Sequence, residues 1–140
     1  MKILGVIPAR YASTRFPGKP LADIKGKSMI RRVYEQASRC TELDEVVVAT
    51  DDERILQHVL SFGGKVMMTS PDHDSGTERC SEVAEKSARS FDVVINIQGD
   101  EPYIDPRQIA QVAACFSNQE VRIATLVKKI NHVVLPQSLI

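Results

Sequence analysis

Net charge, cysteine and long hydrophobic runs are all scarce in this sequence. Lys+Arg and Asp+Glu both number 18, so the formal net charge is +0. A broad nucleic-acid-binding surface needs a surplus of cations, so we expect no nucleic acid as a partner, and any basic site must be local. Cys40, Cys80 and Cys115 lie far apart and form no CxxC pair. This spacing predicts neither a disulfide framework nor a zinc site.

The hydrophobic runs are short. No run approaches the ~20 apolar residues that a membrane span needs, so we expect no membrane association. The first run contains Gly5 and leads into Pro8 and Arg10, which is typical of a strand rather than of a signal peptide. The cytoplasm is therefore the expected location. The 140 residues are 43% hydrophobic and 26% charged, a composition that predicts one globular domain with a buried core.

Val- and Ile-rich runs alternate with amphipathic stretches along the chain. The pattern predicts strands at residues 3–8, 46–49, 66–68, 93–97 and 121–127, and helices at residues 28–38, 53–62, 77–89 and 106–116. Continuous apolar strands that are each followed by a helix indicate a parallel sheet covered on both faces. The predicted fold class is therefore α/β, a Rossmann-like three-layer sandwich with a mostly parallel sheet.

Several side chains can be placed from local rules alone. Ser28 is positioned to cap the helix that follows it, and the polar cluster 50–52 can cap the next helix. Cys80 and Cys115 fall inside predicted helices and are expected in the core. His58 belongs to no readable Ser-His-Asp arrangement and is expected on a solvent-facing surface.

The loop directly after the first strand concentrates polar groups. Residues 8–20 read PARYASTRFPGKP and hold three cations, two hydroxyls and a glycine: Arg10, Arg15, Lys19, Ser13, Thr14 and Gly18. Cations, hydroxyls and backbone N–H groups together suit a polyphosphate. Open α/β sheets keep their ligands at the carboxyl ends of strands, where this loop lies. The alternative is a basic surface loop. The loop matches neither GxxxxGK[ST] nor GxGxxG, so no nicotinamide cofactor is expected.

A second polar segment follows the predicted strand 93–97. It reads Gln98-Gly99-Asp100-Glu101-Pro102 and should reach the same edge of the sheet as the first loop. One carboxylate there is enough to hold Mg²⁺ when phosphate oxygens and waters complete the octahedron. Asp100 and Glu101 point in different directions if the chain is extended, so we expect one of them as the ligand. The alternative is a plain turn, in which Glu101 offsets the dipole of the next helix.

A third polar segment opens the predicted helix 77–89. It reads His73-Asp74-Ser75-Gly76-Thr77-Glu78-Arg79. One of the two hydroxyls, on Ser75 or Thr77, is expected to cap the helix. Arg79 lies one turn into the helix, and Gly76 allows close approach, so Arg79 suits a base or ribose pocket.

Four segments resemble one known family. They are PARYASTRFPGKPL (residues 8–21), VVVATDDERI (46–55), DHDSGTERCSEV (72–83) and NIQGDEPYI (96–104). In sequence, order and spacing they are similar to the 3-deoxy-manno-octulosonate cytidylyltransferases, or CMP-Kdo synthetases. The resemblance runs from residue 1 to about residue 127. It implies a fold of the nucleotide-diphospho-sugar transferase type. It also implies an enzyme that joins CMP from CTP to the sugar acid Kdo and releases pyrophosphate, with Mg²⁺, for lipopolysaccharide biosynthesis.

The resemblance also implies roles for individual residues. The triphosphate would be held by Arg10, Ser13, Arg15 and Lys19. Asp100 would carry Mg²⁺ and would complete the catalytic set formed with Arg10, Arg15 and Lys19. The cytidine pocket would be lined by Ser75, Arg79, Gln98 and the backbone of Pro8 and Ala9.

The length of the chain departs from the family, whose members are longer. We therefore expect residues 1–140 to be the nucleotide-binding part of a single nucleotidyltransferase domain, with the sugar-binding and dimerisation part absent. The apolar tail after His132 also favours a truncated chain. By resemblance the full-length enzyme would be a homodimer. The alternatives are a truncated, inactive nucleotide-binding remnant or an enzyme similar to the CMP-sialic acid synthetases. The residues alone leave open which base is bound.

Overall fold

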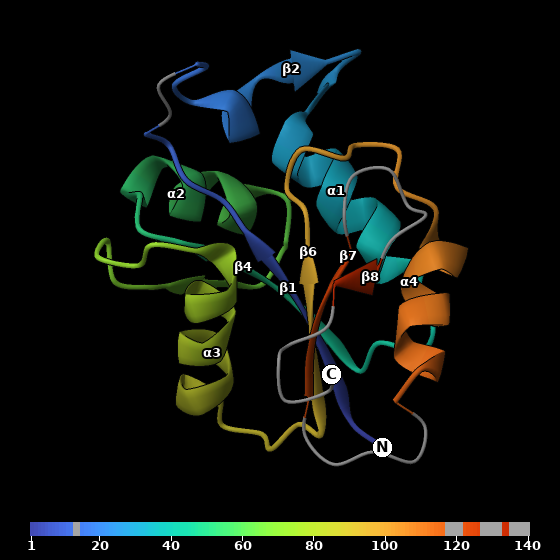
Figure 1. Cartoon of the computed structure of the whole chain (residues 1–140). Coiled ribbons are helices and arrows are strands. Elements are labelled where there is room, and N and C mark those ends of the chain that lie inside the picture. The colour runs from blue at the N-terminus through green and yellow to red at the C-terminus, as the bar shows by residue number, and fades with distance from the viewer. Residues whose placement is uncertain (13–14, 117–121, 127–132, 135–140) are drawn as a thin grey trace.

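The computed structural model describes residues 1–12, 15–116, 122–126 and 133–134. Within these residues the main sheet has six strands in the order β5-β4-β1-β6-β7-β8 (Figure 1). Their bounds are Val66–Met68, Glu45–Thr50, Ile3–Pro8, Val93–Ile97, Arg122–Leu126 and Val133–Val134. The first five strands run parallel, and β8 pairs antiparallel with β7. The α/β class and the mostly parallel sheet are confirmed.

Helices cover both faces of the sheet, and β1 shows how one strand serves two cores. On one face, Ile3 and Ile7 pack in a cluster with buried residues of three helices: α1 (Met29–Ser38), α2 (Glu53–Ser61) and α4 (Pro106–Ala114). On the other face, Leu4 and Val6 pack against α3 (Gly76–Lys86). Figure 1 shows α3 and α4 on opposite sides of the sheet. Alternate side chains of a strand point to opposite faces, so this strand is apolar throughout.

A short irregular region between β1 and α1 was not predicted. It contains a 3₁₀ helix, η1 (Lys19–Leu21), and a hairpin of two two-residue strands, β2 (Asp23–Ile24) and β3 (Lys27–Ser28). The hairpin turn uses Lys25 and Gly26, both with positive φ (54° and 96°). Strands of two residues are too short to show the alternation on which a strand prediction depends.

Local capping rules were reliable in the predicted helices. Ser28 caps α1 by accepting a hydrogen bond from the Arg31 N–H, as predicted. Asp52 caps α2 by accepting from the N–H groups of Arg54 and Ile55. Each cap satisfies donors that a helix N-terminus leaves without intrahelical partners.

Two predictions based on helical periodicity were wrong. Helix α3 ends at Lys86 rather than at residue 89, because Ser87 adopts an extended backbone (ψ 138°). Cys80 is buried as predicted, but Cys115 is exposed at the C-terminal cap of α4. Both errors occur near helix ends, where periodicity carries the least information. Among the described residues, no helix has the length and apolar character needed to cross a membrane.

The prediction that His58 faces solvent holds only in part. The ring is half-buried, and its Nε2 lies 2.5 Å from Ser28 Oγ, so it links α2 to the cap of α1. Because Ser28 Oγ already accepts from Arg31, its own hydrogen can be donated to the neutral ring nitrogen. Burial, with a smaller contribution from the Arg31 charge, lowers the His58 pKa from its ordinary value of 6.5.

This lowered pKa makes a prediction about acid stability. The folded chain binds fewer protons at His58 than the unfolded chain does, so the contribution is complete above pH 6.5 and is lost as the pH falls through the folded pKa. A His58→Gln variant cannot titrate there. Its free energy of unfolding should therefore fall less than that of the unmodified chain between about pH 8 and about pH 5. Urea unfolding at several pH values measures both curves, and parallel curves would contradict the prediction.

Candidate functional site

A cavity of about 980 Å³ opens at the carboxyl ends of β1 and β6. Three chain segments line it: the loop after β1, the segment that leads into α3 and the loop after β6. The lining residues include eight of the predicted site residues, namely Pro8, Ala9, Arg10, Lys19, Ser75, Arg79, Gln98 and Asp100. Arg15 is exposed and is not among the lining residues. Ser13 lies outside the described residues.

Lys19 and Asp100 both line this cavity and form an ion pair. Lys19 Nζ lies 3.8 Å from Asp100 Oδ2, and the side chains are 39% and 37% exposed. The cation follows β1 and the carboxylate follows β6, and these two strands are neighbours in the sheet. The prediction that the two polar loops converge on one edge is thus confirmed. A half-exposed ion pair of this kind is weak, so Lys19 can exchange it for a contact with a ligand at little cost.

Gly99 allows the second loop to approach the end of β1. A Cβ atom at this position would lie 2.8 Å from the backbone oxygen of Pro8. No side chain fits in that space without a shift of the backbone. The parallel register sets Val6 beside Asn96, so the strands end together and the two loops pack directly on each other.

The loop after β1 closes on itself through Tyr11 and Gly18. The Gly18 N–H donates to the Tyr11 carbonyl at 2.8 Å, and Gly18 has a φ of 73°, in the left-handed region that favours glycine. A Cβ at Gly18 would lie 2.9 Å from the Tyr11 ring. The Arg54 guanidinium of α2 stacks 3.3 Å from the centroid of that ring. These contacts fix the start of η1 and with it the position of Lys19. The sequence did not predict these contacts.

Arg79 is the most deeply buried charge in the described part of the site. The residue is 1% exposed and donates to Thr69 Oγ1 and to the Ser70 carbonyl. Its Nη2 also lies 3.9 Å from Asp51 Oδ2. The sequence suggests Arg79 as a pocket residue but not these partners, because they come from the ends of β5 and β4 and share no local pattern with α3. For Asp51 the sequence predicts only a place in a capping cluster.

Ser75 both caps α3 and lines the cavity. Its side chain accepts a hydrogen bond from the Glu78 N–H at 3.2 Å, so the capping prediction holds for Ser75. His73 also lines the cavity, although the sequence predicts no role for it. A single histidine next to a predicted cap gives no pattern that could have marked it.

The donor set fits a magnesium ion held jointly with a polyphosphate. The described residues contain no group of three or more His, Cys, Asp or Glu side chains that would enclose a metal alone. Mg²⁺ is usually bound through one or two carboxylates, with phosphate oxygens and waters as the other ligands. Asp100 supplies one carboxylate at the cavity, beside the cations that suit the phosphates.

Comparisons with known proteins agree with this geometry. The chain belongs to the cytidylyltransferase family, whose pattern it matches over residues 4–139. It is 62% identical over 128 residues to the 3-deoxy-manno-octulosonate cytidylyltransferase of Bacteroides thetaiotaomicron, covering 91% of this chain and 50% of that protein. It is 53% identical over 131 residues to the enzyme of the same name from Geobacter sulfurreducens, covering 93% of this chain and 52% of that protein.

The chain is also similar in three-dimensional structure to a solved protein. The chain superimposes with a TM-score of 0.78 and 52% identity on a CMP:2-keto-3-deoxy-manno-octonic acid synthetase complexed with CTP. The alignment covers 82% of this chain and 47% of that one. The resemblance found in the four sequence segments is therefore confirmed. The chain spans about half the length of the curated relatives that it matches.

The close contact at Gly99 yields a stability prediction. A Gly99→Ala change places a methyl group against the Pro8 carbonyl, which is backbone and cannot rotate away. We expect a loss of about 1–3 kcal/mol in the free energy of unfolding, as for overpacking elsewhere. Gly26→Ala is the matched control, because a Cβ there meets nothing within 4 Å and any cost comes from its φ of 96°. Urea unfolding measures both, and a loss below about 0.5 kcal/mol at Gly99 would contradict the contact.

Proposed function

We propose that this chain carries the nucleotide site of a CMP-Kdo synthetase. A CMP-Kdo synthetase transfers CMP from CTP to the sugar acid Kdo and releases pyrophosphate. The observation that carries the proposal is the ion pair between Lys19 and Asp100. Both residues line one cavity at the carboxyl ends of β1 and β6. The similarity to a solved synthetase complexed with CTP supports the choice of nucleotide.

Each wall of the cavity has a part in this proposal. Arg10 and Lys19, with Arg15 and Ser13 from the same loop, hold the triphosphate. Asp100 is the ligand for Mg²⁺, which when bound neutralises phosphate charge. The cytidine lies against Ser75, Arg79, Gln98 and the backbone of Pro8 and Ala9. On this proposal, residues 1–140 are the nucleotide-binding part of a nucleotidyltransferase domain. The enzyme is cytoplasmic, serves lipopolysaccharide biosynthesis and is a homodimer at full length.

Catalysis on this proposal depends on position and charge. The anomeric hydroxyl of Kdo attacks the α-phosphorus, and pyrophosphate departs on the opposite side. Phosphoryl and nucleotidyl transfers leave little covalent work to the protein, so cations placed along the leaving group supply the stabilisation. Lys19 suits this role because its ion pair with Asp100 is half-exposed and easily exchanged for a phosphate oxygen. Arg10 adds a guanidinium that can grip phosphate oxygens in a bidentate manner.

Binding and turnover can be tested separately in this chain. Isothermal titration calorimetry should detect CTP binding that strengthens with Mg²⁺ and exceeds the binding of UTP and ATP. A coupled pyrophosphate assay with CTP and Kdo then measures turnover. Binding with pyrophosphate release supports the enzyme, and binding without release supports a nucleotide-binding module. A chain that binds no nucleotide in the presence of Mg²⁺ would contradict the proposal.

The two central charges make a second prediction. If the coupled assay detects pyrophosphate release, Lys19→Ala should lower its rate by roughly 10²-fold or more, because the change removes a cation from the leaving group. Asp100→Asn should abolish the gain in CTP affinity that Mg²⁺ gives, because the amide lacks the charge that the cation prefers. Lys2→Ala is the matched control, since Lys2 forms a comparable ion pair with Asp44 (3.9 Å) at the opposite end of β1. Normal Mg²⁺ dependence in Asp100→Asn would show that the metal assignment is wrong.

A further inference from the structure

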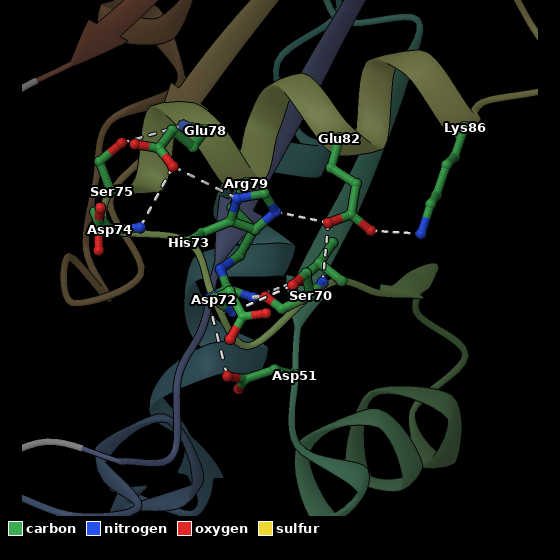
Figure 2. Close-up of polar contacts among 11 residues, drawn as sticks. Asp51, Ser70, Asp72, His73, Asp74, Ser75, Glu78, Arg79, Glu82 and Lys86 are labelled. Carbon is green, nitrogen blue, oxygen red and sulfur yellow. Dashed lines mark hydrogen bonds and ion pairs between the residues drawn. The ribbon is translucent and has the colours of Figure 1, made fainter.

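The segment between β5 and α3 forms one wall of the cavity without being part of the sheet. Residues 69–75 contain no helix or strand, and His73, Asp74 and Ser75 line the cavity. A wall of irregular backbone keeps its shape only if its polar groups find fixed partners. Figure 2 shows that the partners come from side chains of α3.

Glu82 is the centre of these contacts. Its Oε1 accepts from the Ser70 N–H at 2.9 Å and from His73 Nε2 at 2.6 Å. Its Oε2 accepts from Lys86 Nζ at 2.5 Å. These hydrogen bonds, with that from Lys86 the largest influence, lower the Glu82 pKa to about 2, so the carboxylate stays charged at neutral pH. Its side chain is only 12% exposed.

Arg79 attaches the same segment at a second point. It donates to Thr69 Oγ1 and to the Ser70 carbonyl, one turn of α3 before Glu82. The Ser70 residue is therefore held at its N–H by Glu82 and at its C=O by Arg79. On the other side of the His73 ring, Nδ1 lies 3.7 Å from Glu78 Oε2. Helical side chains thus replace the sheet as the support of this wall.

We propose that Glu82 is a positioning residue for the nucleoside half of the site. It is not among the residues that line the cavity, so it acts through His73 and the Ser70 peptide rather than by touching the ligand. The phosphate half is built from other segments, the loop after β1 and Asp100. Loss of Glu82 should therefore weaken the binding of the nucleoside and leave the binding of the phosphates unchanged. The inference rests on the proposed nucleotide site.

The test compares CTP with inorganic tripolyphosphate, each with Mg²⁺, by calorimetry. In Glu82→Ala we expect CTP affinity to fall about tenfold, since the hydrogen bonds that hold Ser70 and His73 are lost. Tripolyphosphate affinity should change less than about twofold. Glu82→Gln keeps an oxygen for the Ser70 N–H but loses the charge that attracts His73 and Lys86, so we expect an intermediate loss. Glu85→Ala is the matched control, because Glu85 is exposed on the same helix.

Two results would overturn the inference. An unchanged CTP affinity in Glu82→Ala would show that the wall needs no such support. Equal weakening of CTP and tripolyphosphate would show a general structural role, and thermal unfolding would reveal the accompanying loss of stability. If Glu82→Ala does not fold, Glu82→Gln decides between the same outcomes. If the unmodified chain binds CTP no more tightly than tripolyphosphate, the proposed nucleotide site itself is wrong. This result is seen in the unmodified chain, so it is distinct from a failure of the proposed role of Glu82.

Discussion

The parallel pairing of β1 with β6 is the constraint on which the rest of the site depends. It brings together two loops that lie about eighty residues apart in the sequence, and it ends both strands at the same edge. Both strands are buried on both faces, so a slip of one residue would exchange the side chains of two separate cores. The register is therefore fixed by packing. Core packing therefore sets the positions of the two loops and with them the distance between Lys19 and Asp100. Gly99 adds to this by letting the second loop approach the Pro8 backbone closely.

The two halves of the cavity hold their charges in different ways. On one side, Lys19 and Asp100 are half-exposed and 3.8 Å apart, an ion pair from which a polyanion can draw Lys19 at little cost. On the other side, Arg79 is buried and Glu82 is nearly so, and each has several hydrogen-bond partners within the chain. Breaking one such pair would leave a desolvated charge, which is costly. The first arrangement suits groups that exchange partners during a reaction, and the second suits groups that must stay in place.

The sequence predicted what depends on near neighbours and on strand order. Apolar runs located the strands, Ser28 was recognised as a cap and residues 50–52 as a capping cluster. The rule for sheet edges brought residues 19 and 100 together. The partners of His58 and Arg79 could not be predicted, because Ser28, Thr69 and Asp51 come from other elements and follow no common spacing. The hairpin at residues 23–28 is too short for any periodic signal. Cys115 was misplaced because it lies at the end of α4, where a helical pattern does not show which turn is the last.

Binding and transfer make separate demands on this fold. Binding a nucleotide triphosphate needs cations, a metal ligand and a shaped wall, and all the lining residues lie within positions 8–100. Transfer also needs a second substrate held within about 3–3.5 Å of the reacting phosphorus, because effective concentration supplies much of the rate. The chain spans about half the length of the curated relatives that it matches. On the proposed function, affinity for CTP therefore reports on the cavity between β1, β6 and α3. Pyrophosphate release reports on how far that cavity suffices for the chemistry.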